Sequence, residues 1–309
     1  MPSVIVTSRD HAHCVTNAVE SALRQEASGR VCVVVIDDAS VDGTTRAVAA
    51  RFGDGVTVIE KPARLGWLDS LQRALACVDD DIIAILDADC VAPPCWLRTV
   101  QAALRADTSI GIVSGPLRHG SSLAAKLLAA TSHAAFVSEA PAVAAYVVDD
   151  NVAFRRDVLT ALVANAPQGA AINDAVGTAW LNRELRRQRI TVRYMPDLAV
   201  DHIVDRVPAQ YAKRFSQSPA TSVHMRRLVP SVRGARWART RFTAAPILPA
   251  ARYVQDLANL CRLREALGIG IAELPVLAAL ALGAEVCFGA GLLVSTAYGR
   301  PPDETAHST

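Results

Sequence analysis

Residues 31–44 read VCVVVIDDASVDGT, and this stretch determines how the N-terminal region is interpreted. Val31 to Ile36 is a continuous apolar run, mostly β-branched, which is typical of a strand buried on both faces of a parallel sheet. The run ends in Asp37 and Asp38, and residues 39–44 are largely types that form turns and cap helices. The stretch therefore predicts a strand that delivers two carboxylates to one edge of a sheet and then leads into a helix.

The same alternation of strand-like and helix-like segments repeats over the first 115 residues. Further strands are expected at 4–6, 56–59, 82–86 and 110–114, and helices at 12–25, 45–52, 68–78 and from residue 96. Such alternation predicts an α/β fold with a doubly wound, mostly parallel, Rossmann-like sheet. Ligands of such sheets bind beyond the carboxyl ends of the strands, where residues 7–9, 37–38 and 87–89 are expected to lie.

Asp87-Ala88-Asp89 closes the apolar strand run 82–86. Two carboxylates on alternate residues at a strand end can hold one hard divalent cation, or one cation and a ribose hydroxyl. A solvated turn is the alternative interpretation of such a short motif. Its position at the end of a buried strand favours the interpretation as a binding site.

The composition of the chain changes after residue 204. We expect one α/β domain over 1–204, a basic helical extension over 205–265 and an apolar tail over 266–309. Residues 205–265 carry 12 Lys and Arg against three acidic residues, and Glu285 is the one charged residue between 274 and 299. This pattern indicates membrane association, with the basic side facing the cytoplasm. A buried or amphipathic helix pair is the alternative.

The overall composition excludes two classes of protein. Lys and Arg number 32 against 30 Asp and Glu, for a net charge of +2, so a uniformly basic nucleic-acid binder is not expected. A hydrophobic content of 51% excludes a disordered chain. The seven cysteines form no CxxC pair, which is typical of reduced cytosolic thiols. We therefore expect a cytoplasmic catalytic domain, at or near the cytoplasmic face of a membrane.

The motifs form an ordered set: residues 4–7, 37–44, 66–73, 87–89, 151–156 and 173–174. Together they resemble the family 2 inverting glycosyltransferases of the GT-A fold, over roughly residues 3 to 215. The resemblance implies transfer of a sugar from a nucleotide-diphospho-sugar, most simply a UDP-sugar, to an acceptor hydroxyl, with Mn²⁺ or Mg²⁺ as cofactor. Processive relatives carry QxxRW, which residues 211–215 and 233–237 lack, so one sugar is expected to be transferred at a time.

Site residues follow from the resemblance and from side-chain chemistry. Asp174 corresponds to the general base, although Asn173 replaces the usual preceding acid. The donor-binding candidates by resemblance are Thr7, Arg9, Asp37, Asp38 and Asp87, and the metal candidates are Asp89, Asp87 and His202. His202 can equally be a structural histidine. Arginine suits phosphate, which adds Arg214 for the donor and Arg155 for the acceptor, and Asp150 and Asn151 lie in the expected acceptor loop.

Two other functions were weighed against glycosyl transfer. A sugar-phosphate nucleotidyltransferase needs a glycine-rich loop after the first strand, and residues 7–11 contain no glycine. A degenerate scaffold that only binds partners or membranes is supported by Asn173 alone. The acceptor stays open between a lipid phosphate, a glycan and a small molecule.

Overall fold

The computed structural model describes residues 2–27, 29–134, 137, 142–144, 147, 149–164, 166, 174–216 and 241–294. For residues 142–144, 174–176 and 241–243 it describes the backbone alone. The chain divides into two compact units, Met1–Val204 and Asp205–Thr309.

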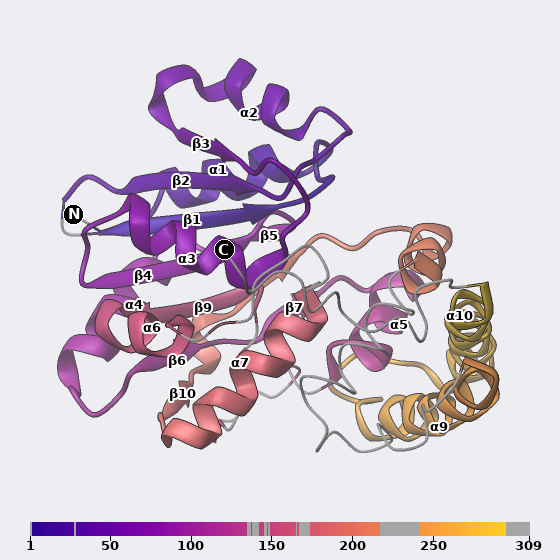
Figure 1. Cartoon of the computed structure of the whole chain (residues 1–309). Helices are drawn as coiled ribbons and strands as arrows, with labels where there is room; N and C mark the ends of the chain where they lie inside the picture. The colour runs from indigo at the N-terminus through magenta and orange to yellow at the C-terminus, as the bar shows by residue number, and fades with distance from the viewer. Residues whose placement is uncertain are drawn as a thin grey trace, which may run out of the picture. The chain divides into compact units, whose positions relative to one another are not determined.

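The first unit is built on a sheet of eight strands in the order β3-β2-β1-β4-β9-β6-β10-β8 (Figure 1). These strands are β1 Ser3–Ser8, β2 Cys32–Asp37, β3 Thr57–Glu60, β4 Ile82–Asp87, β6 Ile112–Ser114, β8 Ala142–Ala144, β9 Asn151–Arg155 and β10 Val192–Tyr194. β1, β2, β3 and β4 run parallel, as do β6 and β10, whereas β9 and β8 pair antiparallel with their neighbours. β9 therefore joins two parallel halves into one mixed sheet.

Helices cover both faces of this sheet. They are α1 Val15–Leu23, α2 Thr44–Phe52, α3 Gly66–Cys77, α4 Trp96–Ala106, α5 Leu123–Thr131, α6 Arg156–Val163 and α7 Asp174–Gln188. Val4 and Val6 pack in one apolar cluster with α1, α2 and α4. The alternate residue Ile5 points to the other face, because successive strand residues do so, and α3 packs there beside α6 and α7. Burial on both faces explains why the strand sequences are continuously apolar.

A second, three-stranded sheet has the order β5-β11-β7. It consists of β5 Cys90–Val91, β7 Leu117–His119 and β11 Val200–His202. β5 begins three residues after the end of β4, so this small sheet is tied to the carboxyl edge of the large one. β11 pairs antiparallel with β5 and parallel with β7, which places Cys90, His202 and His119 in one row across the three strands.

The second unit contains two long helices, α9 Arg241–Arg262 and α10 Leu274–Val294, which pack against each other. Residues 207–216 are also helical. Tyr211 donates a hydrogen bond to the Leu280 carbonyl at 2.7 Å, and a Cβ on Gly283 would lie 2.5 Å from the Tyr211 Oη. Gly283 therefore allows the tyrosine to contact α10. Ile271–Val294 is long and apolar enough to cross a membrane, by length and composition alone.

The predicted α/β fold with a mostly parallel sheet and C-terminal helices is confirmed. The five expected strands of the first 115 residues are present, and the helices begin or end within a few residues of their predicted limits. The sequence did not predict that β9 runs antiparallel.

Candidate active site

The carboxyl ends of β1 and β4 bring Thr7 and Asp87 together. The two residues are register partners, and the Thr7 hydroxyl donates to the Asp87 Oδ1 at 3.0 Å. The backbone N–H of Ala88 donates to the same oxygen, also at 3.0 Å. These two donors fix one oxygen of a half-buried carboxylate at the edge of the sheet. Thr7 and Asp87 therefore lie where a ligand of a doubly wound sheet is expected.

Asp89 and His202 meet across the pairing of β5 with β11. The His202 Nε2 lies 3.3 Å from the Asp89 Oδ2, and the His11 Nε2 lies 3.8 Å from the same oxygen. Asp89 is 9% exposed and the His202 side chain 6% exposed, so both are largely removed from solvent. Asp89, Cys90 and His202 form a group whose ligand atoms all lie within 4.8 Å of one another, close enough to hold a metal ion.

Cys90 contributes to this group as a thiol. Burial, followed by the charge of Asp89, raises the pKa of the Cys90 thiol well above its usual value. The protonated sulfur donates to the Asp89 Oδ1 at 3.7 Å. Asp89 and His202 supply an oxygen and a nitrogen ligand suited to a hard or borderline divalent cation, and the Cys90 sulfur lies within reach of the same point.

Three histidine rings cluster beside Asp89. The centroids of His119, His133 and His202 lie 5.1 to 5.4 Å apart, and the His119 Nε2 is 2.9 Å from the His133 Nδ1. Burial, followed by the neighbouring His202, lowers the pKa of His119 to about 4. His119 is therefore a neutral imidazole at pH 7, with a lone pair on one ring nitrogen.

The carboxylates of Asp37 and Asp38 accept hydrogen bonds from neighbouring residues of the protein. Asp37 accepts bonds from the backbone and side chain of Ser40, which closes the turn after β2. Asp38 accepts the N–H groups of Leu65 and Gly66 at the start of α3 and pairs with the buried Lys61 at 3.1 Å. Both carboxylates thus stabilise the edge on which a donor would bind, and their contact with a donor stays a prediction.

Arg9 follows β1 and donates to the Asp38 carbonyl at 3.1 Å. Its side chain is 30% exposed and lies 3.5 Å from the Asp10 carboxylate. The guanidinium therefore remains accessible at the same edge as Thr7 and Asp87. A role in donor binding stays a prediction.

The structure corrects the acceptor-binding prediction for Asn151. The residue is 1% exposed, its Oδ1 accepts the Trp96 indole N–H at 2.9 Å, and its Nδ2 donates to the Leu198 carbonyl at 2.6 Å. A second bond reaches the Pro116 carbonyl at 3.3 Å. The side-chain amide therefore hydrogen-bonds to other elements of the core. Its burial prevents it from contacting an acceptor.

The prediction for Arg155 is corrected for a different reason. Because β9 runs antiparallel to β4, Asn151 pairs with Leu86 near the site, whereas Arg155 pairs with Ile82 at the opposite end of the strand. Its guanidinium donates to the carbonyls of Ile110, Leu104 and Asp107. Arg155 therefore stabilises the far edge of the sheet and does not contact a ligand at Asp87.

Three predicted residues stay predictions. Asp150 lies beside the histidines, and its carbonyl accepts the Asp87 N–H at 3.0 Å. Asp174 is the first residue of α7, but its side chain and all of Asn173 lie outside the described residues. Arg214 belongs to the second unit, where it faces Glu285 at 3.5 Å.

Comparison with known proteins identifies the family. The sequence profile described as "Glycosyl transferase family 2" matches residues 3–163, about half of the chain. This protein belongs to glycosyl transferase family 2. The matched region contains Thr7, Asp87 and Asp89 but ends before His202.

Individual relatives of this family 2 glycosyltransferase are distant. An uncharacterized glycosyltransferase of Haemophilus influenzae is 26% identical over 110 residues, which is 35% of this chain and 34% of the relative. The match thus spans about a third of that relative's length. The mannosyltransferase PcManGT from Pyrobaculum calidifontis, solved in complex with GDP-Man and Mn²⁺, is 21% identical over 94% of this chain and 84% of its own, with a TM-score of 0.50. This likeness shows a GT-A-type fold.

A second solved structure is similar over less of the chain. Glucosyl-3-phosphoglycerate synthase from Mycobacterium tuberculosis, in complex with Mn²⁺, UDP and glucosyl-3-phosphoglycerate, is 19% identical over 74% of this chain and 80% of its own, with a TM-score of 0.49.

Several residues near the candidate site could not be identified from the sequence. His11, His119 and His133 were not singled out, because their spacing in the chain matches no metal motif and only the fold brings them to Asp89. Lys61 was also missed. Its position directly after the third strand, at the edge where ligands bind, is the one signal that could have identified it.

Proposed function

We propose that this enzyme is an inverting, non-processive glycosyltransferase that moves one sugar from a UDP-sugar to an acceptor hydroxyl with the help of Mn²⁺ or Mg²⁺. One observation carries the proposal: Thr7 with Asp87, and Asp89 with His202, gather at the carboxyl edge of strands β1 and β4. This arrangement supports a nucleotide site next to a cation site in a family 2 fold.

The donor set at Asp89 fits a divalent cation. A carboxylate oxygen and an imidazole nitrogen 3.3 Å apart are compatible with one ion that both side chains contact, after small adjustments. Asp89 and His202 would hold the ion, with Asp87 nearby toward the ribose. When bound, such an ion stabilises the negative charge that develops on the departing diphosphate.

The chain's own residues orient the two reactants. Asp87, fixed by Thr7 and Ala88, presents its second carboxylate oxygen to a ribose hydroxyl, and Arg9 supplies an accessible guanidinium for the nucleotide. We propose that Asp174 takes the proton of the acceptor hydroxyl. The acceptor oxygen then bonds to the anomeric carbon as the bond to the diphosphate oxygen breaks, and the nucleoside diphosphate leaves with that electron pair. One carboxylate base suffices for this single displacement, which inverts the anomeric centre.

Calorimetric titration of UDP, GDP and TDP, with and without Mn²⁺, tests the donor site. We expect UDP to bind in a Mn²⁺-dependent manner, and Asp89→Ala to abolish that dependence. Asp54→Ala, at an exposed position in the turn before β3, is the matched control and should bind as the wild type does.

Two outcomes of this titration would contradict the proposal. Mn²⁺-dependent binding of GDP or TDP in preference to UDP would reject the UDP-sugar donor. An unchanged affinity in Asp89→Ala would remove the cation from Asp89.

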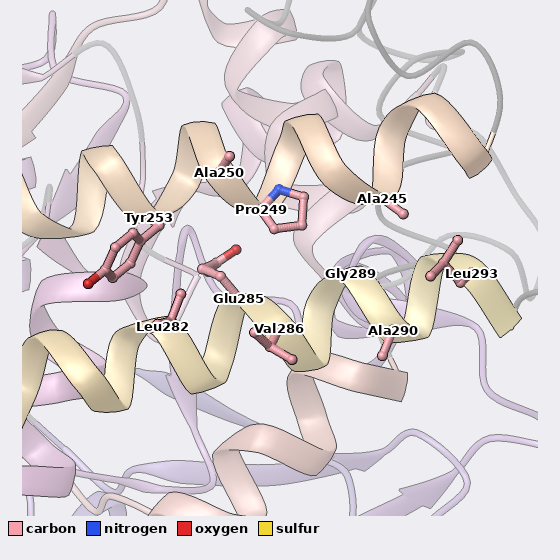
Figure 2. Close-up of a pocket in the computed structure, with 10 residues that line it drawn as sticks. All are labelled: Ala245, Pro249, Ala250, Tyr253, Leu282, Glu285, Val286, Gly289, Ala290 and Leu293. Carbon is pink, nitrogen blue, oxygen red and sulfur yellow. The ribbon is translucent and has the colours of Figure 1, made fainter.

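We further propose that the second unit associates with the cytoplasmic face of a membrane. Glu285 on α10 is 1% exposed and pairs with Arg252 at 2.9 Å, whereas the next residue, Val286, is 62% exposed. Figure 2 shows the Glu285 carboxylate directed toward α9, with apolar residues of both helices around it. Charge inside and apolar side chains outside are typical of a helix pair in contact with lipid.

The exposed apolar residues form stripes along both helices. On α9 they include Ile247 and Val254, and on α10 they include Val276, Leu282, Val286, Leu293 and Val294. Between the helices lies a groove of about 480 Å³ lined mostly by small and apolar side chains (Figure 2). The basic composition of residues 205–265 adds an attraction to anionic headgroups.

Sedimentation with vesicles of phosphatidylcholine and phosphatidylglycerol tests this association. Full-length protein should sediment with the vesicles, and the double variant Leu282→Glu with Val286→Glu should stay in the supernatant. Val41→Glu, at a 90% exposed apolar position of the first unit, is the matched control and should sediment. Full-length protein that remains soluble and monodisperse beside the vesicles would contradict membrane association.

A further inference from the structure

The histidine cluster contains a second group of potential metal ligands beside the one at Asp89. His133, Asp150 and His202 each offer one ligand atom, and these atoms all lie within 4.8 Å of one another. His133 follows α5, Asp150 precedes β9, and His202 ends β11. His119 supports the group because its ring contacts both His133 and His202. Residues from four segments of the first unit thus converge on one point.

A buried atom of His202 indicates that the cluster is built for a ligand. The Nε2 of His202 faces Asp89, while its Nδ1 is buried and has no hydrogen-bond partner in the part of the chain that the structure describes. Leaving a buried polar nitrogen without a partner costs about 1–3 kcal/mol, and a bound ion is one partner that would remove this cost. The side chain itself is 6% exposed, so bulk water does not replace the missing partner.

The two groups differ in chemistry. The group at Asp89 lies next to a second carboxylate, Asp87, and suits Mn²⁺ or Mg²⁺. The other combines two imidazoles with one carboxylate, a set preferred by Zn²⁺, Co²⁺ and Ni²⁺. We infer that His133, Asp150 and His202 form a second cation position, which takes a zinc-like transition metal rather than Mn²⁺ or Mg²⁺.

His202 belongs to both positions, and this has a consequence for regulation. A neutral imidazole has one nitrogen with a free lone pair, so it can ligate one cation at a time. A zinc ion bound by His202 at the second position therefore prevents the same imidazole from ligating the cation at Asp89. The two positions are occupied alternatively, and Zn²⁺ antagonises the Mn²⁺-dependent donor binding. This antagonism rests on the proposed function, whereas the second position itself does not.

Metal titration of the full-length chain without nucleotide tests the second position. Zn²⁺ affinity is measured by chelator competition, and Co²⁺ is followed by its visible absorption. We expect His133→Ala to lower Zn²⁺ affinity at least tenfold and to weaken the Co²⁺ bands. Asp89→Ala should leave Zn²⁺ affinity within about twofold. His13→Ala, at an exposed histidine, is the matched control and should behave as the wild type.

Several outcomes would overturn the inference. Equal Zn²⁺ affinity in wild type, His133→Ala and His133→Gln, with helical content retained by circular dichroism, would exclude the second position. Unaltered binding of UDP with Mn²⁺ at saturating Zn²⁺, with two metal ions per chain, would exclude alternative occupancy. If UDP does not bind with Mn²⁺ at all while the zinc results hold, the proposed function fails and the second position stands.

Discussion

The two units of the chain distribute charge in opposite ways. In the first unit the strands are buried on both faces, and the carboxylates of Asp87 and Asp89 gather at the sheet edge. In the second unit Glu285 and Asp256 are 1% and 3% exposed, while Val254 and Val286 are 67% and 62% exposed. The first pattern supports the proposed ligand site, and the second supports the proposed contact of the helix pair with lipid.

This contrast indicates different roles for acidic residues in the two units. At the sheet edge a carboxylate is held in place by neighbours such as Thr7 so that it can act on a ligand. Between α9 and α10 a carboxylate neutralises the guanidinium groups of Arg214 and Arg252. Replacing a carboxylate of the proposed site should therefore abolish activity, whereas replacing Glu285 should reduce stability.

The largest effect is expected for Asp174→Asn. Loss of a general base typically lowers kcat about 10²- to 10⁴-fold, while calorimetric affinity for the donor with Mn²⁺ should stay unchanged. The thermal transition should not move. Normal turnover in this variant would place the base at another residue and weaken the assigned role of the first-unit carboxylates.

Glu285→Gln should lower the free energy of unfolding by about 3 kcal/mol. The substitution removes one charged partner from each of two guanidinium groups, and their partial exposure keeps the loss at the lower end for buried pairs. Denaturant unfolding in mild detergent measures this effect. Glu265→Gln, at a side chain that is 90% exposed, is the control and should change stability by less than about 0.5 kcal/mol. If both variants are equally stable, the buried Glu285 carboxylate does not stabilise the fold.

Gly115→Ala tests packing behind the first-unit site. An added Cβ would lie 2.4 Å from the Leu198 carbonyl oxygen, just before β11, and such overpacking costs about 1–3 kcal/mol. Gly120→Ala is the control, since a Cβ there meets nothing within 4 Å. Thermal unfolding distinguishes the two. If Gly115→Ala unfolds at the same temperature as the wild type, β11 and His202 can shift without a loss of stability.

The smallest effect concerns pH. Burial, followed by the charge of Glu285, raises the pKa of Asp256 from 3.8 to about 7 against the opposing effect of Arg252 and Arg214. A raised carboxyl pKa favours the folded state fully below about pH 4, and this contribution is lost as the pH rises toward 7. Asp256→Asn should therefore stabilise the protein more at pH 8 than at pH 5, as measured by thermal unfolding. A constant difference at both pH values would show that Asp256 ionises normally.

Much of the fold could be predicted from local sequence patterns. Buried parallel strands need continuous apolar runs, so Val31 to Ile36 and Ile82 to Leu86 were recognisable. The direction of β9 could not be predicted, because an apolar run carries no information about whether its partner runs parallel. Arg155 was misassigned for this reason: its strand runs away from the site.

The site was predictable where short motifs follow strands. Thr7, Asp87 and Asp89 have a local signal, and the structure brings them to one edge of the sheet. Asn151 shares that location but is enclosed by the core, and burial of a single amide cannot be read from sequence. His119 and His133 become neighbours of His202 only through tertiary pairing, so no spacing rule could identify them.

The pairing of β5 with β11 affects how the enzyme is made. Asp89 and Cys90 leave the ribosome long before His202, and the half of the chain that matches the family profile ends at residue 163. A nascent chain of that length contains Thr7, Asp87 and Asp89 but not yet His202. Closing the large loop between β5 and β11 is entropically unfavourable and therefore late. The pairing that brings His202 beside Asp89 should thus form after the parallel strands of the first unit, while the second unit is still being synthesised.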